Sequence, residues 1–99
     1  MDEATFDVLE VLGNRVRMEI VIGLYHGDKS AVDFAFPLEI TTTAVIKHLK
    51  ILENVGLITR KKVGRRNMCS LSKEALLAIS AWPELLDVSW LDMLTLEGK

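Results

Sequence analysis

The segment TTTAVIKHLKILENVG, residues 41–56, constrains the fold most, because it predicts a short helix with two different faces. At about 100° per residue, Val45, Leu49 and Leu52 fall on one stripe, which suits a hydrophobic core. The opposite stripe holds small polar and cationic side chains that could reach bases and phosphates, namely Thr43, Lys47, Lys50 and Asn54. The threonines at the start offer an N-cap, and Gly56 suits a left-handed residue after the helix.

The charge of the chain is unevenly distributed, although its net charge is only −2. Residues 1–46 carry a net −5, residues 47–73 carry +7, and residues 74–99 carry −4. A basic patch on an acidic body is the electrostatic footprint of a protein that binds nucleic acid. A solvated, charged hairpin is the alternative interpretation of the same run.

Length and composition indicate one small domain over 1–99 with a thin core. Hydrophobic residues make up 49% of the chain, more than such a core can bury, so we expect a partner subunit to cover part of them. No run reaches the roughly 18 apolar residues that a membrane span needs. Cys69 is the only cysteine, so no internal disulfide can form and we expect a cytoplasmic protein.

The elements before residue 41 follow helix-turn-helix order. We expect helices over 3–12 and 14–27, with Asn14 as the N-cap of the second and Gly23 allowing close packing within it. A short helical segment beginning at residue 31 is expected to stop at Pro37, because proline cannot continue a helix. A turn then leads into the recognition helix, over about 41–54.

A basic two-stranded hairpin is expected directly after the recognition helix. Residues 57–62, LITRKK, favour a strand, Gly64 allows a turn, and residues 67–71, NMCSL, favour the return strand. A hairpin in this position is a wing, over about 57–71. Its arginines at positions 65 and 66 are expected at the tip, within reach of the DNA backbone.

These elements predict a set of DNA-binding side chains. On the helix we expect contacts to bases from Thr42, Thr43, Ile46 and Lys47, and to a phosphate or a base from Lys50. On the wing we expect contacts to the backbone from Arg60, Lys62, Arg65 and Arg66.

The C-terminal part predicts an amphipathic helix over about 73–96, begun by Ser72 and kinked or restarted at Pro83. Its two tryptophans are more than a single core of this size needs. We therefore interpret this helix, together with the first one, as a dimer interface. The residues expected there are Phe6, Leu9, Trp82, Leu86, Trp90, Met93 and Leu94. A helix folded back onto its own domain is the alternative.

Three segments together resemble ArsR-type winged-helix repressors. LGNRVRMEIV resembles the start of that family's second helix, and AVIKHLKILENVGLITRKKVGRRNMCSL resembles its recognition helix and wing. WPELLDVSWLDML looks like the tryptophan-bearing last helix of a metal-free branch. The resemblance implies a winged helix-turn-helix fold, mostly α with a small two-stranded antiparallel hairpin, a homodimer, and repression at a near-palindromic operator. The sequence departs from the family at Ile46, where a serine is usual.

Residues for metal binding or catalysis are present but lack the necessary spacing. His26, His48 and Cys69 are too scattered for a tetrahedral metal site. We find no paired carboxylates, no nucleophile beside a base and no phosphate-cradling glycine loop at a spacing that suits catalysis. We therefore expect no enzyme activity, no metal and no cofactor.

The leading hypothesis is a dimeric, sequence-specific regulator that binds double-stranded DNA and acts as a repressor. The alternative is a winged-helix protein-interaction module with weak or lost DNA binding, which the apolar residues 34–40 and Ile46 favour. A third hypothesis is redox control of DNA binding through Cys69. No residue pattern specifies a small-molecule or protein effector.

Overall fold

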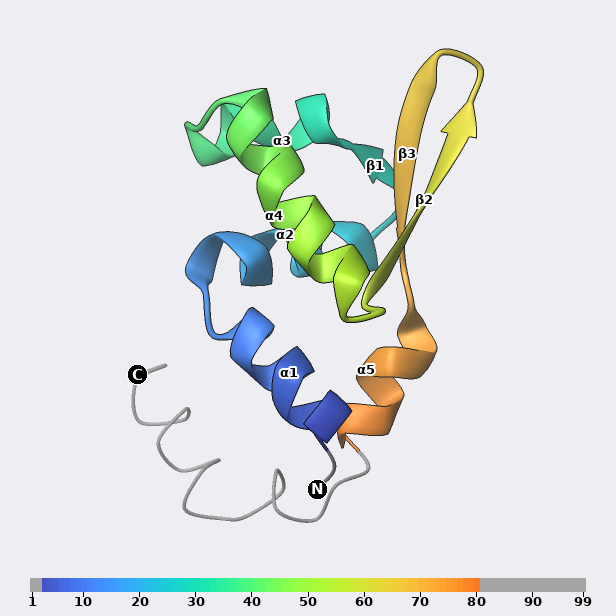
Figure 1. Ribbon diagram of the computed structural model, residues 1–99. Coiled ribbons are helices and arrows are strands. Elements are labelled where there is room, and N and C mark those ends of the chain that lie inside the picture. Colours follow the sequence, from blue (N-terminus) through green and yellow to red (C-terminus); the bar gives the residue numbers. More distant parts are fainter. Residues whose placement is uncertain (1–2, 81–99) are drawn as a thin grey trace.

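The computed structural model describes residues 3–80, in which helices pack around one hydrophobic core and a hairpin projects from them (Figure 1). The elements in chain order are α1 (Glu3–Leu12), α2 (Arg15–Tyr25), β1 (Lys29–Ser30), α3 (Ala31–Leu38), α4 (Thr42–Asn54), β2 (Ile58–Val63), β3 (Arg66–Leu71) and α5 (Lys73–Ser80). None of these helices is long and apolar enough to cross a membrane.

The first two helices form as the sequence predicts. The Oδ1 atom of Asn14 accepts a hydrogen bond from the backbone N–H of Arg17, which caps α2. Gly23 faces α3 so closely that an added Cβ would lie 2.7 Å from Cε1 of Phe34. The prediction that Gly23 allows close packing is therefore confirmed.

The helix predicted from residue 31 continues past Pro37, so the expected stop there was wrong. Pro37 is the last residue but one of α3, where the missing N–H removes a single intrahelical hydrogen bond. The helix ends instead at Leu38, and its C-cap is Glu39, whose φ of 57° is left-handed. There the N–H of Glu39 donates to the carbonyl of Phe36, and that of Ile40 donates to the carbonyl of Ala35.

The central helix, α4, places its apolar stripe in the core. Val45, Leu49 and Leu52 are at most 2% exposed, as predicted. Thr41 caps the helix by accepting a hydrogen bond from the N–H of Ala44. Gly56 follows with a left-handed φ of 80°, which any residue with a Cβ would adopt only with strain.

The sheet has three strands in the order β1–β3–β2, not the two that the sequence predicts. The hairpin of β2 and β3 is present, and β1 pairs antiparallel with the far side of β3. Its register joins Lys29 to Cys69 and Ser30 to Met68. A strand of two residues carries no alternating pattern and is held by a distant segment, so local sequence does not reveal it.

The described residues include only part of the expected dimer interface. Phe6 on α1 is 59% exposed, while Val8 and Val11 on the same helix are buried. Leu9 is half-buried. Ser72 caps α5 by accepting from the N–H of Ala75, as predicted. The remaining residues expected at the interface lie outside the described residues, namely Trp82, Leu86, Trp90, Met93 and Leu94.

Candidate nucleic-acid interface

The outer face of α4 is polar and open to solvent. Thr43, Lys47 and Lys50 are exposed on the side opposite the buried stripe of the helix, and Thr42 is exposed in its first turn. Ile46 is half-buried, at the flank of the helix. A helix that is anchored by one stripe presents the other in a fixed orientation, as groove reading requires.

The start of α4 and the wing share a cavity of about 260 Å³. Thr42 and Ile46 line it from α4, and Arg60 and Asn67 line it from the sheet. The structure therefore brings two of the residues predicted on the helix next to the wing, where Arg66 lines the same cavity. Lys47, which was predicted beside them, is not among the residues that line this cavity.

The outer half of the hairpin is strongly solvent-exposed and cationic. In β2 only Ile58 is buried, and the strand is exposed from Thr59 to Val63. Gly64 takes a left-handed φ of 63° at the turn, and the side chain of Arg65 is exposed beside it. Among the ion pairs within residues 3–80, none involves Lys62 or Arg65, and the same holds for Lys47 and Lys50 on α4.

Arg60, by contrast, has a carboxylate partner on α4. Its Nη2 atom lies 3.0 Å from Oε1 of Glu53, and its Nε atom donates to the same oxygen at 3.1 Å. Both side chains are about one-third exposed. The pair joins the last turn of α4 to the first half of β2, so Arg60 is not an unengaged cation that waits for a phosphate.

Arg66 is paired as well, and it lies at the start of β3, opposite Val63 in the ladder. Its Nη2 atom donates to Oδ2 of Asp33 at 2.9 Å and to Oγ of Ser30 at 2.9 Å. From its sequence, Arg66 was predicted to reach outward from the tip, and no sequence signal pointed to Asp33. The spacing of Ser30 and Asp33 is that of a capping box, but nothing local indicates a partner 33 residues away.

His48 connects the inner flank of α4 to the first two helices. The Nη1 atom of Arg17 lies 3.3 Å from Nδ1 of His48, and the Nε atom of Arg17 donates to the carbonyl of Val11. Burial lowers the pKa of His48, and the positive charge of Arg17 lowers it further. The imidazole is therefore neutral at pH 7 and belongs to the packing of α4, not to its DNA-facing side.

Cys69 is buried in β3, only 1% exposed, and burial raises the pKa of its thiol. A protonated, enclosed thiol reacts slowly, so redox control through Cys69 remains a hypothesis that the geometry does not favour. Within the described residues, no three His, Cys, Asp or Glu side chains lie close enough together to hold a metal ion.

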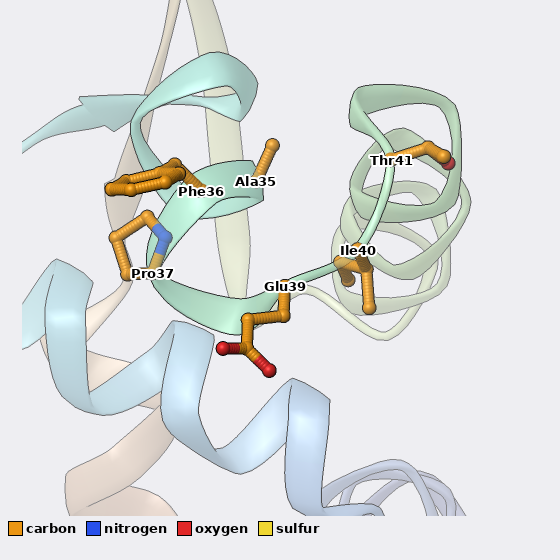
Figure 2. A pocket seen from close by; sticks show the side chains of 6 residues that line it. All are labelled: Ala35, Phe36, Pro37, Glu39, Ile40 and Thr41. Carbon is orange, nitrogen blue, oxygen red and sulfur yellow. The ribbon is translucent and has the colours of Figure 1, made fainter.

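An apolar surface lies at the turn between α3 and α4. An open hollow of about 590 Å³ is lined by Ala35, Phe36, Pro37, Glu39, Ile40 and Thr41. Figure 2 shows Phe36 and Pro37 together on α3, with Ile40 and Thr41 beyond the turn at Glu39. Phe36 is 89% exposed, which is unusual for so large an apolar side chain.

Solved structures with this fold include transcriptional regulators. An ArsR-like transcriptional regulator from Rhodococcus sp. RHA1 is 28% identical, with a TM-score of 0.75 over 93% of this chain and 87% of its own. A possible transcriptional regulator for arsenical resistance is 27% identical, with a TM-score of 0.76 over 92% of this chain and 95% of its own.

A more distant solved structure shares the fold alone. It is a homodimeric winged helix-turn-helix DNA-binding domain from Mycobacterium bovis, a possible ArsR-family regulator. It is 19% identical, with a TM-score of 0.71 over 79% of this chain and 73% of its own. Neither the protein-family models nor the curated proteins gave a match.

The similarity to these solved structures agrees with the order of the elements, the exposed face of α4 and the hairpin that follows it. They confirm the resemblance that the sequence indicates: the chain resembles ArsR-type winged-helix transcriptional regulators.

Proposed function

We propose that this protein is a dimeric, sequence-specific DNA-binding regulator that represses transcription at a near-palindromic operator. The observation that carries the proposal is the two-sided construction of α4. Its apolar stripe is fully packed, while Thr43, Lys47 and Lys50 stand exposed on the opposite face. A face of this kind on a rigid helix suits the major groove.

Each group of side chains has a role in this proposal. Thr42, Thr43, Ile46 and Lys47 read base edges, and Ile46 suits the methyl group of a thymine. Lys50 contacts a phosphate or a base. Lys62 and Arg65, which have no carboxylate partner among the described ion pairs, contact the DNA backbone. Arg60 and Arg66 were predicted to join them, but both are engaged by carboxylates within the molecule.

Dimerisation through α1 and the C-terminal helix completes the proposal. The large exposed fraction of Phe6 on α1 and of Leu77 on α5 (59% and 68%) supports an apolar surface that another subunit covers. The Mycobacterium bovis domain of the same fold is homodimeric. A two-fold dimer would place its two copies of α4 in major grooves about one helical turn apart.

Selection of bound fragments from a random duplex pool, at about 0.1 M salt, tests the proposal. We expect an enriched inverted repeat whose half-sites are about one helical turn apart. A variant in which Lys47 and Lys50 are alanine should enrich no such repeat. Weak, salt-sensitive binding without any enriched sequence would contradict a sequence-specific regulator.

DNA binding alone does not distinguish a repressor from an activator, so repression needs its own experiment. The selected operator is placed between a promoter and a reporter, and the protein is expressed from a separate plasmid. We expect reporter expression to fall with the wild-type protein and to stay high with the Lys47→Ala/Lys50→Ala variant. A rise in expression would identify an activator that binds the same DNA.

A second candidate function is a protein-interaction module, and the exposed Phe36 is the observation that favours it. Replacement of Phe36 by serine should then abolish association beyond the dimer, measured by sedimentation, without altering DNA affinity. A wild-type dimer that shows no further association and binds no dye for apolar surfaces would contradict this function.

A further inference from the structure

The wing is joined to the helix-turn-helix by a short backbone connection. Strand β1, which directly precedes α3, pairs with β3 at only two positions, and the second of these pairs is Ser30 with Met68. Beyond Met68 the outer part of β3 is paired with β2 alone. Two-stranded ribbons twist strongly, so the direction of the wing beyond that point depends on side-chain contacts.

Arg66 supplies such a contact two residues beyond Met68. Its guanidinium reaches back to Ser30 Oγ and to both oxygens of Asp33, at distances of 2.9, 3.2 and 2.9 Å. Asp33 is itself held, because its Oδ2 atom accepts from the backbone N–H of Ser30 at 2.8 Å and from the Ser30 hydroxyl at 3.0 Å. The carboxylate is thus fixed to the first turn of α3 before Arg66 binds it.

The electrostatics of the pair argue against a phosphate contact by Arg66. The hydrogen bonds from the backbone and side chain of Ser30, with a further contribution from Arg66, lower the pKa of Asp33, so this carboxylate is ionised at pH 7. A phosphate that approached Arg66 would also approach this negative charge. An arginine that is already neutralised by a carboxylate releases few counterions from DNA, whereas an unpaired one releases about one.

We propose that Arg66 is a positioning residue, and that the cluster of Ser30, Asp33 and Arg66 fixes the wing against α3. This inference rests on the proposed function, in which the wing meets the DNA backbone. In it, Arg66 holds the hairpin at the angle from which Lys62 and Arg65 reach phosphates. Asp33 then supports DNA binding although its charge is repelled by DNA.

The test compares Asp33→Asn, Arg66→Met and the double variant with Arg65→Met as a matched control. Asparagine at position 33 keeps an oxygen for the Ser30 N–H, so α3 can still begin there. Arg66→Met leaves the capping box untouched. DNA affinity is measured on the selected operator between about 0.05 and 0.2 M salt.

We expect Asp33→Asn to weaken DNA binding by about two- to fivefold, the range of an exposed ion pair, with an unchanged salt slope. Arg66→Met should weaken DNA binding by the same factor as Asp33→Asn. The double variant should bind DNA no more weakly than either single variant, because both substitutions break the same interaction. Arg65→Met should instead reduce the salt slope by about one contact. Tighter binding by Asp33→Asn with a steeper slope would overturn the proposal, because it would show Arg66 released to a phosphate.

Amide hydrogen exchange of the free protein supplies a readout that needs no DNA. Amides of the hairpin between residues 61 and 68 should exchange about two- to fivefold faster in Asp33→Asn and Arg66→Met than in Arg65→Met. Amides of α2 should be unchanged in all variants. Equal hairpin exchange in all variants would overturn the positioning role even if the protein binds DNA. Faster exchange without any DNA binding would instead contradict the proposed function alone.

Discussion

Arg17 and His48 form a contact in which a guanidinium lies 3.3 Å from a neutral imidazole, between α2 and the inner flank of α4. Arg17 is held in place by its hydrogen bond to the carbonyl of Val11, at 2.7 Å. Protonation of His48 would set two positive charges against each other at this junction. Protonation of His48 would therefore weaken the packing of α4 against α2.

The first prediction concerns pH. The pKa of His48 is lowered in the folded protein from its ordinary value of 6.5, so the unfolded chain binds the proton more readily. The contribution of His48 to the free energy of unfolding is complete above about pH 6.5 and is lost as the pH falls below that value. Urea denaturation at pH 8 and pH 5.5 measures this loss.

A matched pair of variants isolates the effect. His48→Gln should reduce the difference in unfolding free energy between the two pH values. His26→Gln, at an exposed histidine at the end of α2, is the control for the replacement of a histidine by glutamine. If both variants keep the full pH dependence, other groups are responsible for it.

The second prediction concerns the wing. Replacement of Lys62 and Arg65 by alanine should weaken binding to every DNA sequence and lower the salt slope by about two phosphate contacts. Neither side chain has an ion-pair partner among those described, so both are available to phosphates. Affinity is measured by fluorescence anisotropy over a salt series, on the operator and on an unrelated duplex. An unchanged slope would remove the wing from the interface.

The third prediction concerns sequence reading by α4. Lys47→Ala should change the preferred base at one position of each half-site, because a good base contact contributes about 1–3 kcal/mol of discrimination. Repeated selection with the variant measures the new preference. Lys73→Ala, an exposed lysine at the start of α5, is the control and should change nothing. A uniform loss of affinity across sequences would assign Lys47 to a phosphate.

The fourth prediction concerns helix packing. Gly23→Ala should destabilise the protein by about 1–3 kcal/mol, the usual cost of overpacking, although alanine favours a helix. The new Cβ would lie 2.7 Å from the ring of Phe34, which is buried and cannot move away freely. In a Phe34→Leu background the same substitution should cost less, as thermal unfolding would show. An equal cost in both backgrounds would exclude the ring as the cause.

The sequence predicted the parts of the fold that depend on local pattern. The buried stripe of α4 follows from its helical period, and Asn14, Thr41 and Ser72 have side chains that suit a cap. Gly64 marked the wing turn because few other residues accept its φ of 63°. These signals lie within a few residues of the structure that they specify.

The parts that the sequence did not reveal depend on partners far along the chain. β1 exists because Lys29 and Ser30 meet Cys69 and Met68, some 40 residues away. In the candidate site, the helical period of α4 was enough to predict that its cations are exposed. The engagement of Arg66 by Asp33 was not, because it requires the sheet to bring β3 against α3.

The pairing of Arg60 with Glu53 and of Arg66 with Asp33 divides the cations of the hairpin into two groups. In both pairs a carboxylate from a helix neutralises the arginine, so the paired arginines have little attraction for DNA. Lys62, opposite Asn67, and Arg65, at the turn, have no such carboxylate among the described ion pairs. Anchorage to the helices and attraction to DNA are therefore assigned to different side chains, so a single substitution can alter one and leave the other intact.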